Sequence, residues 1–132
     1  MARSSGDLQF DVLALRGLAM AYVGLGAPDA LTRCHDALAA LFEVRYWQKI
    51  WQTLESATLA LAITGRMEQA AIVLGRLDAQ SSGYGIEHDL RFRQRARDLI
   101  EADGPHASAQ SRGARMSPED LVTNAIAFCA VD

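Results

Sequence analysis

The sequence predicts an all-α protein, and three observations predict it. Apolar residues recur at three- and four-residue steps along most of the chain, as they do on one face of an α-helix. Short segments that contain glycine, proline or serine separate these stretches. No segment alternates apolar and polar residues for long enough to predict a strand. We therefore expect about six helices, packed as antiparallel pairs.

The first two predicted helices form one such pair. The segment from Leu8 to Leu25 has an apolar stripe, and the glycines around its end favour termination there. The second helix is predicted from Pro28 to Val44, because proline suits the first helical position and Asp29 favours the positive end of the helix dipole. The very short turn between the two requires them to pack antiparallel.

Two more helices follow in the same manner. A third is predicted from Tyr46 to Ile63 and ends at Thr64 and Gly65. A fourth begins near Met67 and ends before the loop signal Ser-Ser-Gly-Tyr-Gly at residues 81–85.

The last third of the chain has a less regular pattern. A fifth helix is predicted from Glu87 to Ala102, and residues 103–116 are predicted to be a linker because glycine, proline, serine and arginine replace the apolar pattern. The sixth helix begins at Ser117, which is a capping residue, and Pro118 takes the first helical position.

The helix pairs form an internal repeat. The glycines between the helices of each pair, Gly26 and Gly65, lie about forty residues apart. Small and large residues around them follow a loose tetratricopeptide-like pattern, which predicts a short superhelical array. We expect residues 1–102 to form the helical-repeat domain and residues 117–132 to be its C-terminal capping helix.

Length, composition and charge limit the function classes. The chain has 132 residues, of which 50% are hydrophobic and 22% charged, as in one ordinary globular domain that does not cross a membrane. Its net charge of −3 disfavours binding to nucleic acid. Two cysteines are too few for a disulfide scaffold, and no signal peptide opens the sequence, so we expect a cytoplasmic protein.

Three strings carry a resemblance to a known family. They are RYWQKIWQTL at residues 45–54, LAITGRMEQAA at residues 61–71 and GARMSPEDLVTNA at residues 113–125. In this order they resemble the C-terminal helical-repeat region of actinobacterial signalling ATPases, regulators that couple adenylate-cyclase-like, ATPase and LuxR-type DNA-binding domains. The chain has no Gly-x-x-x-x-Gly-Lys-Ser/Thr phosphate loop, so the resemblance implies a repeat module without ATP binding.

Five residues are candidates for contact with a protein partner. Trp47 and Trp51 lie one helical turn apart and face the same way, next to Tyr46. Either core packing between repeats or a partner-binding groove explains them. Arg91 and Arg95 share one side of the fifth helix, where a solvated helix with ion pairs and an anion site are the alternatives.

No catalytic, cofactor-binding or metal-ligating residue is predicted. Cys34 and His35 are adjacent on a helix, so their side chains diverge by about 100° and do not chelate one ion. A buried cysteine beside a surface histidine is the simpler interpretation. His88 and His106 have no partner at ligand spacing.

These observations predict a non-catalytic module for protein–protein interaction or regulation in a signalling or transcription-regulator system. One alternative is a part or relative of an ATP-dependent regulator or adenylate cyclase whose catalytic domains lie outside this chain. A weaker alternative is a small DNA-binding helical protein. A short repeat array leaves apolar faces at its ends, so we also expect a homodimer formed through these faces.

Overall fold

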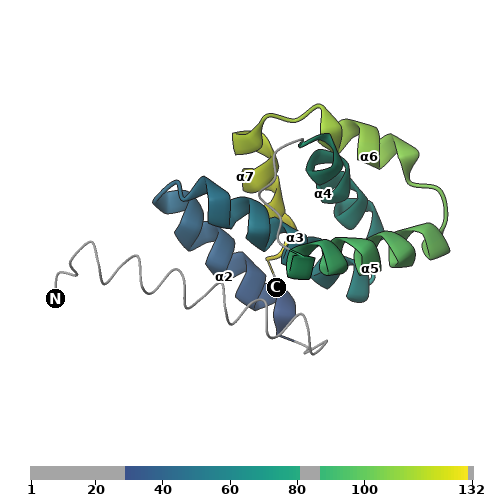
Figure 1. The fold of residues 1–132 in the computed structure, drawn as a ribbon, viewed down its shortest axis with the longest axis horizontal. Coiled ribbons are helices and arrows are strands. Elements are labelled where there is room, and N and C mark those ends of the chain that lie inside the picture. The colour runs from purple at the N-terminus through teal and green to yellow at the C-terminus, as the bar shows by residue number, and fades with distance from the viewer. Residues whose placement is uncertain (1–28, 81–86, 131–132) are drawn as a thin grey trace, which may run out of the picture.

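The computed structural model describes residues 29–80 and 87–130 and confirms the all-α class (Figure 1). These residues form six helices and no strand. The helices are α2 (Ala30–Glu43), α3 (Trp47–Ile63), α4 (Met67–Ala79), α5 (Glu87–Asp103), α6 (Ala107–Ala114) and α7 (Pro118–Phe128). The helix predicted from Leu8 to Leu25 lies outside the described residues.

Helix α3 is the centre of the fold. It packs against α2, α4, α5 and α7, and every residue from Ile50 to Ala62 is buried. Figure 1 shows α3 near the middle of the described helices and α6 at their edge, beside α4. Five of these buried residues are polar, namely Gln52, Thr53, Glu55, Ser56 and Thr58. The two threonines donate their hydroxyl hydrogens to carbonyl oxygens one turn earlier, each at 2.7 Å, which satisfies them inside the helix.

The turns that join α2 to α3 and α3 to α4 have the same geometry. Arg45 and Gly65 both have a positive φ, of 56° and 85° respectively. The next residue, Tyr46 or Arg66, donates its backbone N–H five residues back, to Leu41 in the first turn and to Leu61 in the second. This is the Schellman motif, which satisfies the last free carbonyls of a helix and reverses the chain in three residues. Each turn therefore brings consecutive helices into contact, α2 with α3 and α3 with α4.

The apolar stripes of α2 and α4 form much of the core. The buried apolar residues of α2 are Ala30, Leu31, Cys34, Ala37, Leu38 and Leu41, and those of α4 are Ala70, Ala71, Ile72, Val73, Leu74 and Leu77. The residues of α2 recur at three- and four-residue steps, the pattern from which this helix was predicted, whereas every residue of α4 from Ala70 to Gly75 is buried because α4 packs against several helices.

The linker predicted over residues 103–116 contains a helix, so that prediction is wrong for residues 107–114. Helix α6 packs against α4 at a very short separation. A Cβ atom on Gly75 of α4 would clash with the backbone of Gln110, and one on Gly113 of α6 would clash with the backbone of Ile72. The two glycines therefore allow the helix backbones to touch, and no large apolar residue is needed to hold α6 in place.

The C-terminal helix α7 begins as predicted and closes the helix cluster. The Ser117 hydroxyl accepts the backbone N–H of Asp120 at 3.1 Å, and Pro118 takes the first position. At the other end, Arg66 Nη1 donates to the carbonyl oxygen of Phe128 at 2.7 Å, where a positive charge also complements the helix dipole. Helix α7 packs against α2, α3 and α4. The superhelical arrangement of repeats stays a prediction.

In the part of the chain that the structure describes, no helix has both the length and the apolar character that a membrane span requires.

Candidate functional site

An aromatic cluster lies where α2 turns into α3. The ring centroids of Phe42 and Trp47 are 6.1 Å apart, with the rings at 79° to each other. Those of Trp47 and Trp51 are 6.2 Å apart, which confirms that the two tryptophans face the same way. Trp51 is 6% exposed and belongs to the core, whereas Phe42, Tyr46 and Trp47 are only partly buried. The cluster is therefore anchored in the core and reaches the surface.

Two arginines lie against the rings of this cluster. The guanidinium carbon of Arg45 is 3.9 Å from the centroid of Phe42, and the guanidinium carbon of Arg76 is 5.1 Å from the centroid of Trp51. Both distances allow a cation–π attraction. Arg76 Nε also donates to the carbonyl oxygen of Met116, at 3.1 Å, so it ties α3 and α4 to the end of α6. We call Phe42, Arg45, Tyr46, Trp47 and Trp51 the aromatic–arginine cluster.

The arginines of α5 divide between two sides of the helix, as predicted. Arg91 and Arg95 are exposed. Arg93 and Arg97 instead point to acidic residues of other helices, with Arg93 bonded to Glu55 of α3. The five predicted partner-binding residues therefore lie on two elements, three in the aromatic–arginine cluster and two on α5.

Two arginines of α5, Arg93 and Arg97, form ion pairs with carboxylates of α3 and α4 at the edge of the core. The Glu55 side chain is 2% exposed and that of Arg93 is 22% exposed. Arg97 donates to both carboxylate oxygens of Asp78 of α4, at 3.0 and 2.7 Å. The hydrogen bond to Glu55 raises the pKa of the Arg93 guanidinium, and the bond to Asp78 raises the pKa of Arg97. Both arginines therefore stay charged.

Both cysteines are buried, as predicted for Cys34. Burial raises the pKa of the Cys34 thiol well above its ordinary range, and the nearby Cys129 adds to the shift. Burial also raises the pKa of Cys129 to about 12, against a smaller lowering by Arg66. Because thiolates are the reactive form of cysteine, neither thiol is suited to act as a nucleophile near neutral pH.

The histidines within the described residues pair with nearby aspartates. His35 Nδ1 lies 3.2 Å from Asp36 Oδ1, and His106 Nε2 lies 2.9 Å from Asp103 Oδ2. Both are contacts between residues at most three positions apart. In residues 29–80 and 87–130, no group of three or more His, Cys, Asp or Glu side chains is arranged to hold a metal ion.

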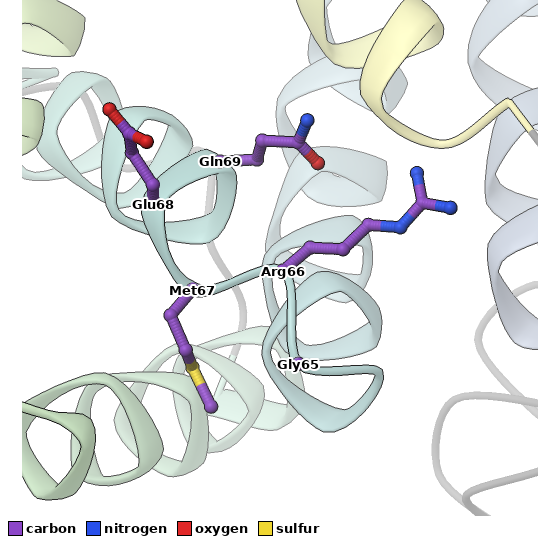
Figure 2. A pocket seen from close by; sticks show the side chains of 5 residues that line it. All are labelled: Gly65, Arg66, Met67, Glu68 and Gln69. Atoms are coloured by element: carbon purple, nitrogen blue, oxygen red, sulfur yellow. The ribbon is translucent and has the colours of Figure 1, made fainter.

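Two cavities lie at helix turns. One, of about 290 Å³, is lined by Gly65, Arg66, Met67, Glu68 and Gln69 (Figure 2). Figure 2 shows that the side chains of Met67 and Glu68 point away from those of Arg66 and Gln69. The other, of about 470 Å³, lies between α5 and α6 and is lined by Ile100, Glu101, Gly104, Pro105, His106, Ala107 and Gln110. A ligand site needs polar groups that converge, and the side chains around the first cavity do not.

Sequence analysis did not identify several residues of these sites. Phe42, Arg45 and Arg76 join the aromatic rings, and Glu55 and Asp78 pair with arginines of α5. Phe42 and Arg45 come shortly before Tyr46 and Trp47 in the sequence. This closeness could have identified them as members of the cluster. The ion pairs join residues 19 and 38 positions apart, which helical periodicity does not reveal.

Comparison with protein-family models, with curated proteins and with solved structures finds no match to this chain.

Proposed function

We propose that this chain is a non-catalytic helical module that binds a protein partner in a bacterial signalling or transcription-regulation system. The observation that carries the proposal is the aromatic–arginine cluster at the turn between α2 and α3. Tyrosine, tryptophan, phenylalanine and arginine are enriched at protein interfaces, where a few of them supply most of the binding energy. Trp47 packs against the buried Trp51 and is itself only partly buried. Such a ring is held in place before a partner arrives, so little side-chain entropy is lost on binding.

The resemblance noted in the sequence supports the same proposal. The string RYWQKIWQTL, which resembles the tryptophan-bearing helix of actinobacterial regulators, supplies Arg45, Tyr46, Trp47 and Trp51 of the cluster. We therefore place the module in a cytoplasmic regulator of that kind. ATP hydrolysis or cyclase activity in such a system would come from domains outside this chain.

The carboxylates, thiols and imidazoles named below are paired or buried within the chain. This favours a binding function over catalysis. Glu55 and Asp78 pair with arginines of α5. The two cysteines have raised pKa values, and His35 and His106 contact neighbouring aspartates. The homodimer stays a proposal. Helix α7, the predicted capping helix, buries Leu121, Val122 and Ala125 within its own chain.

The proposal is tested by replacing Trp47. Tagged wild-type chain, Trp47→Ala and the control Arg115→Ala are used to recover bound proteins from the native host, with quantitative mass spectrometry as the readout. Arg115 is exposed at the turn between α6 and α7 and is not part of the aromatic–arginine cluster. A true partner is recovered equally by wild type and the control, and at least about tenfold less by Trp47→Ala, as expected for a binding hot spot.

Circular dichroism establishes that each variant is folded before the comparison. If every stoichiometric partner binds Trp47→Ala as well as it binds wild type, the aromatic–arginine cluster is not the binding surface and the proposal fails.

A further inference from the structure

Two arginines lie at the ends of a continuous row of aromatic rings. The row runs from Phe42 through Trp47 to Trp51, with successive ring centroids 6.1 and 6.2 Å apart. At one end, the guanidinium carbon of Arg45 is 3.9 Å from the centroid of Phe42. At the other end, the guanidinium carbon of Arg76 is 5.1 Å from the centroid of Trp51. The aromatic–arginine cluster, together with Arg76, therefore combines aromatic rings with two positive charges.

Neither of these two arginines is paired with a carboxylate of the described residues. Arg45 donates its Nη1 hydrogen to the carbonyl oxygen of Phe42, and Arg76 donates its Nε hydrogen to the carbonyl oxygen of Met116. By contrast, two arginines of α5 and one of α6 each pair with a carboxylate. The chain as a whole has a net charge of −3. Two positive charges of an acidic chain thus lie beside the rings without a neutralising carboxylate from residues 29–80 and 87–130.

The chemistry of the guanidinium group favours a carboxylate as the missing partner. A guanidinium has five N–H hydrogens, and each of these arginines donates one of them to a carbonyl oxygen. Its planar edge matches the two oxygens of a carboxylate, and hydrogen bonds between charged groups are stronger than neutral ones. Contact with an aromatic ring restrains each guanidinium, so less side-chain entropy is lost when an anion binds.

The positions of the two arginines favour two carboxylates over one phosphate. A phosphate group is commonly held by a cluster of arginines that converge on it. Here Arg45 and Arg76 lie over different rings, which Trp47 joins. Two separate carboxylates match this arrangement, and the negative net charge of the chain opposes a nucleic acid as the source of the anions.

Apolar surface lies beside the same arginines. Val44, directly before Arg45 in the chain, is 39% exposed. Phe42, Tyr46 and Trp47 are only partly buried. An apolar side chain of a ligand can therefore pack here while carboxylates on either side of it bind the arginines.

We propose that the aromatic–arginine cluster and Arg76 bind an acidic segment of the partner protein, in which an apolar side chain lies between two carboxylates. One carboxylate binds Arg45, the other binds Arg76, and the apolar side chain packs against Trp47. This inference rests on the proposed function, because it specifies the chemistry of the partner that the same surface binds.

The first test selects ligands without assuming their sequence. A phage library of random dodecapeptides is selected on the full-length chain in the presence of excess soluble Trp47→Ala chain, which removes peptides that bind elsewhere. Aspartate and glutamate are expected at least about twice as often in the selected peptides as in the unselected library, because opposite charges favour association. Selected peptides without this enrichment, or the absence of any peptide that distinguishes the two chains, would overturn the inference.

The second test assigns the charge preference to Arg45. Fluorescence anisotropy compares the binding of a labelled selected peptide to wild type, Arg45→Glu and the control Arg115→Glu. Arg45→Glu reverses the charge and binds at least about tenfold less tightly. The control makes the same charge change at an exposed arginine outside the cluster and changes the affinity by less than about twofold, because salt screens distant charges.

A charge exchange identifies the contact itself. The acidic residues of the peptide are replaced by lysine one at a time, and at one position the replacement restores binding to Arg45→Glu by at least about tenfold. Wild-type affinity in Arg45→Glu, or an equal loss in Arg45→Glu and Arg115→Glu, would show that Arg45 does not contact the peptide and would sink the inference. Circular dichroism checks that both variants are folded, and the composition of the selected peptides tests the inference without either of them.

The recovery experiment with Trp47→Ala separates this inference from the proposed function. If Trp47→Ala loses its partner but the selected peptides are not acidic, the proposed function stands and the acidic segment is wrong. If Trp47→Ala keeps every partner, both proposals fail.

Discussion

Cys34 and Cys129 are the residues whose chemistry the fold changes most. Both side chains are fully buried, Cys34 in α2 and Cys129 directly after α7. Burial disfavours the thiolate, and this raises the pKa of Cys129 from its ordinary value near 9 to about 12. In the unfolded chain both thiols are exposed to water, so burial does not raise their pKa values. The two states therefore differ in the number of protons that they bind at alkaline pH.

This difference predicts a loss of stability at alkaline pH. Above about pH 9 the unfolded chain releases the Cys129 proton while the folded chain keeps it. The stabilisation is thus complete below pH 9 and is lost as the pH rises towards 12. Between about pH 8 and about pH 10.5, Cys129 alone lowers the free energy of unfolding by about 2 kcal/mol. Urea denaturation at about pH 8 and at about pH 10.5 measures this loss of the free energy of unfolding.

The variant Cys129→Ala is the control for this prediction. It is less stable than wild type at both pH values because it loses buried volume, and its free energy of unfolding falls less with pH. Parallel pH dependence in wild type and variant would show that Cys129 ionises equally in both states.

At the residue scale, local contacts were predictable and distant ones were not. The alignment of Trp47 and Trp51 follows from their four-residue spacing and is confirmed. The separation of Arg91 and Arg95 from the other two α5 arginines follows from the same rule. Nothing local indicates that Glu55 is buried, because a glutamate in a helix is usually solvated.

At the scale of elements, the two Schellman turns differ in one residue that matters. Gly65 adopts its positive φ without strain, whereas Arg45 adopts the same conformation with a Cβ atom present. A Cβ atom on Gly65 would contact nothing within 4 Å, so only backbone strain opposes a larger residue there. Arg45 also donates to the Phe42 carbonyl and lies over its ring.

A matched set of substitutions separates strain from side-chain contacts. Gly65→Ala lowers the free energy of unfolding by about 1 kcal/mol, since it introduces strain alone. Arg45→Ala removes the side-chain contacts and keeps the strain. Arg45→Gly removes both, so it is more stable than Arg45→Ala by about 1 kcal/mol. Urea denaturation of the four chains tests this, and equal stability of the two Arg45 variants would contradict the strained turn.

Helices α2 to α5 were predicted within one or two residues, α7 ends at Phe128, before the predicted end at residue 132, and the omission of α6 has a physical cause. The segment Ala107–Ala114 is short and contains glycine and serine, which are weak helix formers. Its buried residues are only Ala109 and Gly113. Close contact with Gly75 of α4 replaces the large apolar residues that a periodicity search detects. Helix α6 is therefore stabilised by a tertiary contact that its own sequence does not reveal.

At the scale of the whole molecule, the helices surround a centre and are not simply stacked in line. In a linear repeat protein each unit contacts its neighbours only, so parts of the array unfold separately. Here α7 packs against α2 as well as α3 and α4, and α3 contacts four helices. Loss of α3 would expose apolar surface on all of them. We therefore expect the described helices to unfold as one cooperative unit.

This arrangement predicts a single unfolding transition. Trp47 and Trp51 lie in α3, so their fluorescence reports on the centre of the core, whereas far-ultraviolet circular dichroism reports on all helices. In urea the two signals give the same midpoint and slope, as for a two-state domain. The control Gly75→Ala, which disrupts the contact between α4 and α6, shifts both midpoints together to lower urea. A fluorescence midpoint that differs from the circular dichroism midpoint by more than about 0.5 M urea would indicate that the helices unfold in separate groups, as in a linear array.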